Sequence, residues 1–223
     1  MNYQAELEKI LKSIEDKYQI DDKIAEKPKL LLHACCGPCS SYVLEYLNRF
    51  FDITIFYYNP NIHPEAEYTR RLEELEEFLP KFSKNFENPN INLIKEEYNP
   101  EDFYTAIKIK ENPELAKEKE KGVRCYRCYE FRLKKAFEYA KRNNFEYFCT
   151  TLSISPFKDA EKINVIGELL EKTHRENNPT DFCSKWLISD FKKKGGFQRS
   201  LEISREYDLY RQQYCGCVYS KNQ

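Results

Sequence analysis

The sequence predicts a doubly wound α/β fold with a mainly parallel sheet. Short apolar runs alternate along the 223-residue chain with segments of helical periodicity. The first of these runs, residues 30–32, ends abruptly in a cysteine-rich turn, and residues 42–47 then have a helical pattern. Because ligands bind at the carboxyl ends of strands in such sheets, this turn is the first candidate for a functional site.

The amino-terminal half alternates between helix and strand. Residues 4–17 carry Leu and Ile at helical spacing, and we expect Ser40 or Ser41 to cap the helix that follows the first strand. The loop 59–64 contains two prolines, ends the second strand and faces the same crevice. The predicted elements are helices over 4–17, 41–49, 65–78 and 101–110, and strands over 29–35, 53–58 and 91–96.

The carboxyl-terminal half continues the alternation. Residues 111–121 are rich in Lys and Glu, which is typical of a solvated helix or loop. Asp159 precedes a helical pattern and is a suitable cap. The predicted elements are helices over 124–142, 160–174 and 200–207, and strands over 145–152 and 186–189. We expect one α/β domain over residues 1–223, with a helical lead-in over 1–28 and a Cys-Gly-Cys tail over 209–223.

Composition limits the classes of function. The net charge is −1, so a nucleic-acid partner would have to be held by a local basic patch. The sequence shows no secretory signal and no long apolar run, so we expect a soluble, cytoplasmic protein without a membrane partner. Nine cysteines in that compartment indicate metal or redox chemistry, because structural disulfides are rare there.

The cysteines form three groups. Cys125-x-x-Cys128 can chelate a soft metal from one helical turn, and Cys35, Cys36 and Cys39 complete a four-thiolate inventory. Zinc and an iron–sulfur cluster both fit this inventory, and a zinc site that only staples the helix to the sheet is the simplest alternative.

The remaining cysteines differ in context. Cys215-Gly216-Cys217 can ligate metal or form a strained, redox-active disulfide. Cys149 lies in an apolar strand and is expected to be an inert buried thiol, while Cys183 has no near partner and is left unassigned.

A thioredoxin-like interpretation competes with the metal site. Cys36-Gly37-Pro38-Cys39 is identical to the thioredoxin active-site tetrapeptide and lies between a strand and a helix. However, Cys35 stands where Trp is usual, and the chain is about twice as long as a minimal thioredoxin-type domain. That interpretation also leaves the pairs 125/128 and 215/217 without a role.

Several separate motifs together carry a family resemblance. They are Leu31–Ser40 with its three cysteines, Tyr58–Pro64, Glu67-Tyr68-x-x-Arg71, Arg124-Cys125-x-x-Cys128, Ser155-Pro156, Asp190-Phe191-Lys192 and Tyr210-Arg211-Gln212-x-Tyr214-Cys215-Gly216-Cys217. In this combination the chain resembles the cobalamin-independent tRNA epoxyqueuosine reductases, the QueH type, from about residue 30 to 217. The one departure is Gly37, where Ala is common in relatives.

The resemblance implies a fold, a reaction and a site. The fold is a Rossmann-like domain of the adenine-nucleotide α-hydrolase type. The reaction is reduction of the epoxide on the modified wobble base of tRNA to an alkene, with loss of water. The implied ligands of a [4Fe-4S] cluster are Cys35, Cys36, Cys125 and Cys128, the implied redox pair is Cys215 and Cys217, and an additional iron remains open. The partners are tRNA and an external electron donor, not DNA.

Spacing and resemblance disagree on one ligand. Spacing favours Cys36 with Cys39, whereas the resemblance favours the adjacent Cys35 and Cys36, with Cys39 packing underneath in the first helical turn. We follow the resemblance. Candidate proton donors are His33, Tyr58 and Asp190; His33 is equally suited to the core, and Asp190 could be a cap, a proton donor or an oxygen ligand to iron.

The expected RNA contacts are basic and aromatic side chains near the crevice. The candidates are Arg70, Arg71, Arg124, Arg127, Lys192, Lys193, Lys194 and Arg199 for phosphates, and Tyr58, Tyr126, Tyr129 and Tyr214 for stacking on bases. Three hypotheses therefore stand: an iron–sulfur tRNA-modifying oxidoreductase, a metal-free thiol oxidoreductase, and a non-catalytic zinc-stapled RNA-binding module.

Overall fold

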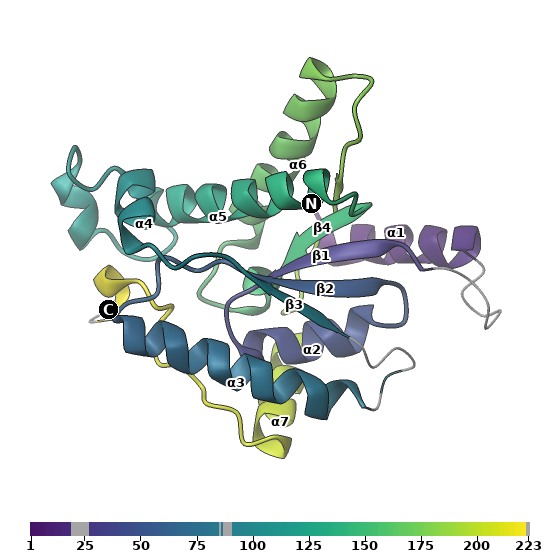
Figure 1. The fold of residues 1–223 in the computed structure, drawn as a ribbon, viewed down its shortest axis with the longest axis horizontal. Coiled ribbons are helices and arrows are strands. Elements are labelled where there is room, and N and C mark those ends of the chain that lie inside the picture. The colour runs from purple at the N-terminus through teal and green to yellow at the C-terminus, as the bar shows by residue number, and fades with distance from the viewer. Residues whose placement is uncertain (19–26, 85, 87–90, 222–223) are drawn as a thin grey trace.

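The computed structural model describes residues 1–18, 27–84, 86 and 91–221. Its centre is a five-stranded, all-parallel sheet in the order β3-β2-β1-β4-β5 (Figure 1). The strands are β1 (Lys29–Ala34), β2 (Asp52–Tyr57), β3 (Asn92–Lys95), β4 (Tyr147–Thr150) and β5 (Lys185–Trp186). This is the strand order of a Rossmann-type sheet, so the predicted doubly wound parallel fold is confirmed.

Helices cover both faces of the sheet (Figure 1). The α-helices are α1 (Tyr3–Tyr18), α2 (Gly37–Leu47), α3 (Glu65–Ser83), α4 (Pro100–Ile107), α5 (Val123–Arg142), α6 (Ala160–Asn177) and α7 (Gly196–Glu206). Three short 3-10 helices, η1 (Pro113–Lys117), η2 (Thr151–Ile154) and η3 (Val218–Ser220), lie in the connections. None of these described helices is long and apolar enough to cross a bilayer.

The two hydrophobic layers follow from the alternation of side chains along the central strand. Leu30 and Leu32 of β1 pack with apolar residues of α1, α2 and α3, whereas Leu31 packs with residues of α5 and α6. Residues buried on both faces explain why β1 reads as a continuous apolar run.

The lead-in and the tail are only partly described. Helix α1 lies within the predicted 1–28 lead-in, and residues 19–26 of that lead-in lie outside the described part of the chain. The tail 209–223 is described to residue 221.

The predicted caps had mixed outcomes. Asp159 caps α6 by accepting a hydrogen bond from the Lys162 amide at 3.2 Å, as expected. The prediction for α2 was wrong, because that helix begins at Gly37 and its N-cap is Cys36. Pro38 fits the first turn, where no amide donor is needed, so the helix starts before Ser40.

Several other element boundaries differ from the predicted ones. Strand β4 ends at Thr150, where η2 begins, and β5 contains only Lys185–Trp186 instead of 186–189. Helix α3 continues past Phe78 through Pro80 to Ser83, and α7 begins at Gly196.

Candidate metal and redox site

A cavity of about 670 Å³ lies where the carboxyl end of β1 meets the tail. Seven cysteines from three separate chain segments line it, together with buried cations and a few apolar side chains. The cysteines are Cys35, Cys36, Cys39, Cys125, Cys128, Cys215 and Cys217. The structure therefore brings together all the predicted cysteine site residues.

The first thiol group lies on the turn from β1 to α2. Cys36 has extended backbone (φ −175°, ψ 165°), so the chain leaves the strand before the helix begins. The sulfurs of Cys35 and Cys36 are 3.8 Å apart, and those of Cys35, Cys36 and Cys39 all lie within 4.8 Å of one another. Cys39 is in the first turn of α2 and packs against the hydrophobic core as expected, and it also lines the cavity.

The second group lies on the first turns of α5. The carboxylate of Glu118 accepts hydrogen bonds at 2.7 Å from the amides of Val123 and Arg124, which satisfies the start of the helix. Cys125 and Cys128 are each 8 % exposed and face the cavity together, because residues three apart share a helix face.

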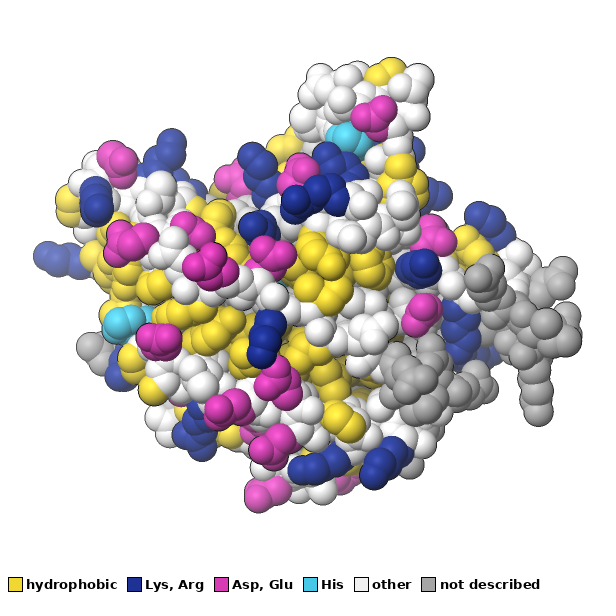
Figure 2. Space-filling view, viewed as in Figure 1, with side chains coloured by type: hydrophobic (Ala, Val, Ile, Leu, Met, Phe, Trp, Pro, Cys, Tyr) yellow, Lys and Arg dark blue, Asp and Glu magenta, His cyan; other side chains and the backbone are white. Residues whose placement is uncertain are grey.

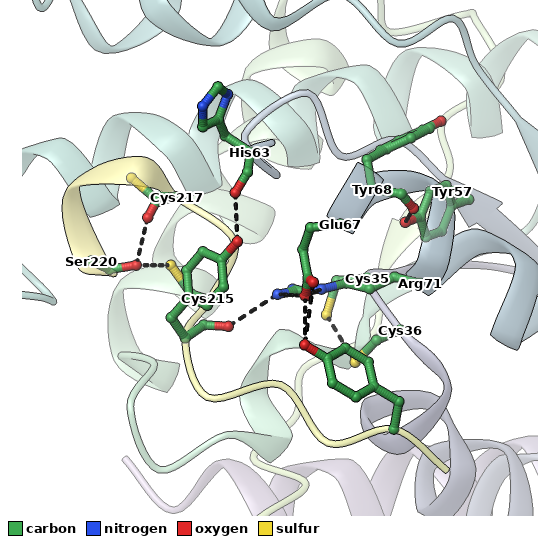
Figure 3. A network of polar contacts seen from close by, with 12 residues as sticks. Cys35, Cys36, Tyr57, His63, Glu67, Tyr68, Arg71, Cys215, Cys217 and Ser220 are labelled. Carbon is green, nitrogen blue, oxygen red and sulfur yellow. Dashed lines mark hydrogen bonds and ion pairs between the residues drawn. The ribbon is translucent and has the colours of Figure 1, made fainter. Parts of the chain in front are cut away.

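The third group lies on the tail. The His63 amide donates to the carbonyl of Gly216 at 2.8 Å. The thiol of Cys215 lies 3.0 Å from the Ser220 hydroxyl (Figure 3). Gly216 has φ +99°, and a Cβ there would lie 2.7 Å from Ile62, so glycine is required between the cysteines. All nine cysteines of the chain are free thiols, and Cys215 and Cys217 are not joined by a disulfide.

Three buried arginines line the cavity. Arg71, Arg124 and Arg132 are between 1 and 3 % exposed. The guanidinium of Arg132 lies 4.0 Å from the Cys128 sulfur and donates to Asn59 at 2.5 Å. Hydrogen bonds from Cys36 and Cys39, and then the charges of Arg132 and Arg71, hold the pKa of Cys35 well below its usual value.

A buried ion pair stands beside the tail. Lys158, 8 % exposed, lies 3.3 Å from the carboxylate of Glu120. A hydrogen bond from Cys217, with a contribution from Lys158, lowers the pKa of Cys215 well below its usual value. Burial alone would lower the pKa of Lys158, but Cys215, Tyr129 and Glu120 raise it overall, so Lys158 stays charged.

Several polar atoms at the cavity have no partner. Buried and unpaired are Arg124 Nε and Nη2, Arg132 Nε, Asn61 Oδ1, Gln212 Nε2 and the Tyr129 hydroxyl, all on cavity-lining residues. Unpaired buried donors are costly in native proteins, so their concentration here indicates a site for an electron-rich group. Thiolates beside buried cations and free N–H donors fit an anionic, sulfur-ligated metal centre.

The predicted proton donors lie elsewhere. His33 is fully buried between the Thr150 hydroxyl (2.8 Å) and the Tyr58 carbonyl (3.2 Å), and burial lowers its pKa to about 3, so it is a neutral core histidine. Tyr58 is 4 % exposed, and its ring packs on Phe131. Asp190 does not line the cavity, and its carboxylate pairs with Lys192 at 2.5 Å.

The predicted RNA-contacting residues are only partly gathered at the cavity. Arg71, Arg124, Tyr129 and Tyr214 line it. Arg70 stacks on Tyr210, Arg127 donates to the Ile107 carbonyl, and Arg199 pairs with Glu45 and Glu206. Cationic and anionic side chains are interspersed on the face shown in Figure 2, in line with the net charge of −1.

Several cavity residues were missed by the sequence interpretation, among them Glu120, Arg132, Phe157 and Lys158. Glu120 stands in the Lys/Glu-rich stretch, where no local pattern distinguishes it from its neighbours. Arg132 follows Cys128 by four residues and so shares its helix face, which is a usable signal. Phe157 and Lys158 directly follow the Ser155-Pro156 motif and could have been found with it.

The parallel α/β sheet and the thiol-lined cavity at its carboxyl edge define a cysteine-dependent oxidoreductase with the donor set of a sulfur-ligated metal centre. Family comparison is more specific: the model of the epoxyqueuosine reductase QueH family matches residues 30–223. The chain belongs to this family, which confirms the predicted resemblance and sets aside the thioredoxin-like and non-catalytic alternatives.

Two curated relatives are similar over nearly the whole chain. The epoxyqueuosine reductase QueH of Staphylococcus epidermidis is 37 % identical over 219 residues, which cover 98 % of this chain and 86 % of that one. The one of Staphylococcus aureus is 38 % identical over 222 residues, covering 100 % and 86 %. Among solved structures, the chain is similar to the U34-tRNA thiolase NcsA from Methanococcus maripaludis with its [4Fe-4S] cluster. The TM-score is 0.48 at 12 % sequence identity, over 96 % of this chain and 68 % of that one, which is a distant likeness.

Proposed function

We propose that the chain reduces the epoxide of epoxyqueuosine in tRNA to the alkene of queuosine, and that it does so with a cluster held by Cys35, Cys36, Cys125 and Cys128. The observation that carries the proposal is the convergence of these thiols and of Cys215 and Cys217 on one buried cavity. The family membership supports the reaction, and the donor set supports the cofactor.

The thiols come from two separate elements of the fold, which supports a multi-iron cluster over a single zinc ion. One zinc, at about 2.3 Å from each sulfur, would gather its four thiolates to within about 4 Å of one another. Among the described residues, Cys35, Cys36 and Cys39 form the only group of three or more candidate ligands within 4.8 Å of one another, and Cys125 and Cys128 on α5 are not part of it. A [4Fe-4S] cluster takes one thiolate at each of four irons, so its ligands need not converge on one point, and when bound it would supply electrons one at a time. Cys39 would remain as a thiol for an additional iron.

Cys215 and Cys217 are suited to hold the two electrons and two protons of the reaction. Reduction of the epoxide to an alkene and water consumes two electrons and two protons. Oxidation of two thiols to one disulfide releases the same number, so one turnover of the pair balances one turnover of substrate. An external electron donor must then reduce the disulfide.

Proton handling falls to groups that line the cavity. Burial raises the pKa of the Glu120 carboxyl above its usual value, and this carboxyl lines the cavity beside Lys158 and the redox pair. We place this role on Glu120 and Lys158 because both line the cavity, whereas Asp190 does not.

The test is anaerobic reconstitution followed by turnover. Protein loaded with iron and sulfide should bind both in cluster stoichiometry, absorb broadly in the visible range, and convert epoxyqueuosine-tRNA to queuosine-tRNA with dithionite, as read by nucleoside mass spectrometry. Failure of the fully loaded protein to convert this tRNA would overturn the reaction. Full conversion by the metal-free protein would overturn only the role of the cluster.

A further inference from the structure

The rim of the cavity carries an exposed aromatic ring and two exposed cations. Most cavity-lining residues are buried, but Lys119, Pro156, Phe157, Arg211 and Gln213 are exposed and so mark the mouth. The ring of Phe157 is 68 % exposed, and among the described phenylalanines only Phe182, at 43 %, is also exposed. A single exposed apolar side chain is common, so its position and rigidity decide what it means.

Phe157 is held on a fixed turn. Its amide donates to the Ser155 hydroxyl at 3.2 Å, and the next amide, of Lys158, donates to the Ser155 carbonyl at 3.1 Å. Pro156 restricts the backbone before it, and the buried Lys158–Glu120 pair anchors the chain after it. The ring is therefore presented to solvent at little further cost in conformational entropy.

The substrate of the proposed function places unpaired nucleotides at this rim. The cysteines line the interior, so the modified nucleotide has to enter a cavity of about 670 Å³. Nucleotides on either side of it cannot enter with it and have to lie across the mouth. Aromatic faces and cations that line one groove bind single-stranded nucleic acid, because bases stack on the ring and phosphates contact the charges.

We propose that Phe157 is the stacking platform for an unpaired base next to the modified nucleotide, and that Lys119 and Arg211 contact the flanking phosphates. Arg211 is oriented for this role, since its guanidinium donates to the Ser204 hydroxyl at 3.2 Å and lies 5.8 Å from the ring centre of Phe197. The inference rests on the proposed function, because it takes tRNA as the substrate.

Affinity measurements separate stacking from charge. Phe157→Ala should weaken binding of epoxyqueuosine-tRNA about five- to a hundredfold, and Phe157→Trp should restore it. The matched control is Phe182→Ala, which removes the other exposed phenylalanine and should leave affinity unchanged. The double variant K119Q/R211Q should lower the slope of log affinity against log salt by about two, whereas Phe157→Ala should shift the line without changing its slope.

Turnover at saturating tRNA distinguishes this inference from the reaction itself. If Phe157 only binds RNA, Phe157→Ala should keep the wild-type kcat with dithionite and raise KM. Wild-type tRNA affinity in Phe157→Ala would overturn the inference, with the reaction unaffected. Wild-type tRNA affinity together with slower turnover when a protein supplies the electrons would also overturn the stacking role. It would indicate instead that Phe157 contacts the electron-donor protein.

Discussion

The guanidinium of Arg71 donates from Nη2 to the main-chain oxygen of Tyr214 at 3.2 Å, so helix α3 holds the residue directly before Cys215 (Figure 3). The same side chain is 2 % exposed and donates from Nε to Glu67 at 2.7 Å. Its charge also contributes to lowering the pKa of Cys35, after the hydrogen bonds from Cys36 and Cys39. One buried arginine thus connects the tail to the turn after β1.

Replacing Arg71 should loosen the tail. Arg71→Lys keeps the charge but loses the planar fork that serves both Glu67 and Tyr214. We expect faster alkylation of Cys215 and Cys217 by a thiol reagent and a fall in turnover of about 10- to 100-fold. The control is Arg70→Lys, since Arg70 stacks on Tyr210 and does not line the cavity. Equal alkylation rates in wild type and Arg71→Lys would contradict this role.

The two ligands on α5 are testable by metal content. Cys125→Ser and Cys128→Ser should each lose most of the bound iron and sulfide after anaerobic reconstitution, because a cluster is poorly held by the remaining thiolates. Cys183→Ser is the matched control, since Cys183 does not line the cavity. Wild-type iron in both α5 variants would exclude these residues as ligands and leave the first group as the candidate site.

His33 should make the stability of the metal-free protein depend on pH. Its pKa is lowered from 6.5 to about 3, first because burial disfavours the imidazolium and then because of Arg132. The unfolded chain therefore binds a proton at this histidine near pH 6.5, whereas the folded chain does not. The contribution of neutral His33 to the free energy of unfolding is thus complete above pH 6.5 and is lost progressively down to about pH 3.

Between pH 6.5 and 5, this linkage should cost about 1.5–2 kcal/mol of unfolding free energy. Urea titrations across that range give the measurement, and the His33→Gln variant separates the histidine from carboxyls such as Glu120, whose pKa is also raised. His33→Gln should flatten the dependence even if it lowers stability throughout. An unchanged slope in His33→Gln would mean that another group titrates there.

Local patterns were sufficient for the parts of the fold that depend on neighbours in sequence. The strands β1 and β2 and the helix α5 lie within one residue of the predictions, because apolar alternation and helical spacing are local properties. The start of α2 was missed because Ser40 and Ser41 are good caps in isolation, but Pro38 let the helix begin at Gly37.

The candidate site was predictable to the extent that its residue types are rare. Closely spaced cysteines stand out in a sequence, and the seven cysteines that were singled out all line the cavity. Glu120 and Lys158 did not stand out, because Lys and Glu are common and their ion pair joins residues 38 positions apart. Only the fold places these two charges beside Cys215.

Replacing both Cys215 and Cys217 by Ser separates three roles of the tail. If the two thiols were cluster ligands, the variant would lose iron; if they only packed the tail, nothing would change. As a redox pair they should leave iron content and tRNA affinity at wild-type levels and abolish turnover. The geometry favours this outcome, since both thiols face the cavity and Gly216 supplies the left-handed turn between them. Cys217 also donates a hydrogen bond to the Cys215 sulfur, and this bond lowers the pKa of Cys215. Thiol labelling of the wild type after one turnover without an external donor should find both thiols protected, and reduction should restore them. Normal conversion of epoxyqueuosine-tRNA by the double variant would rule the redox pair out.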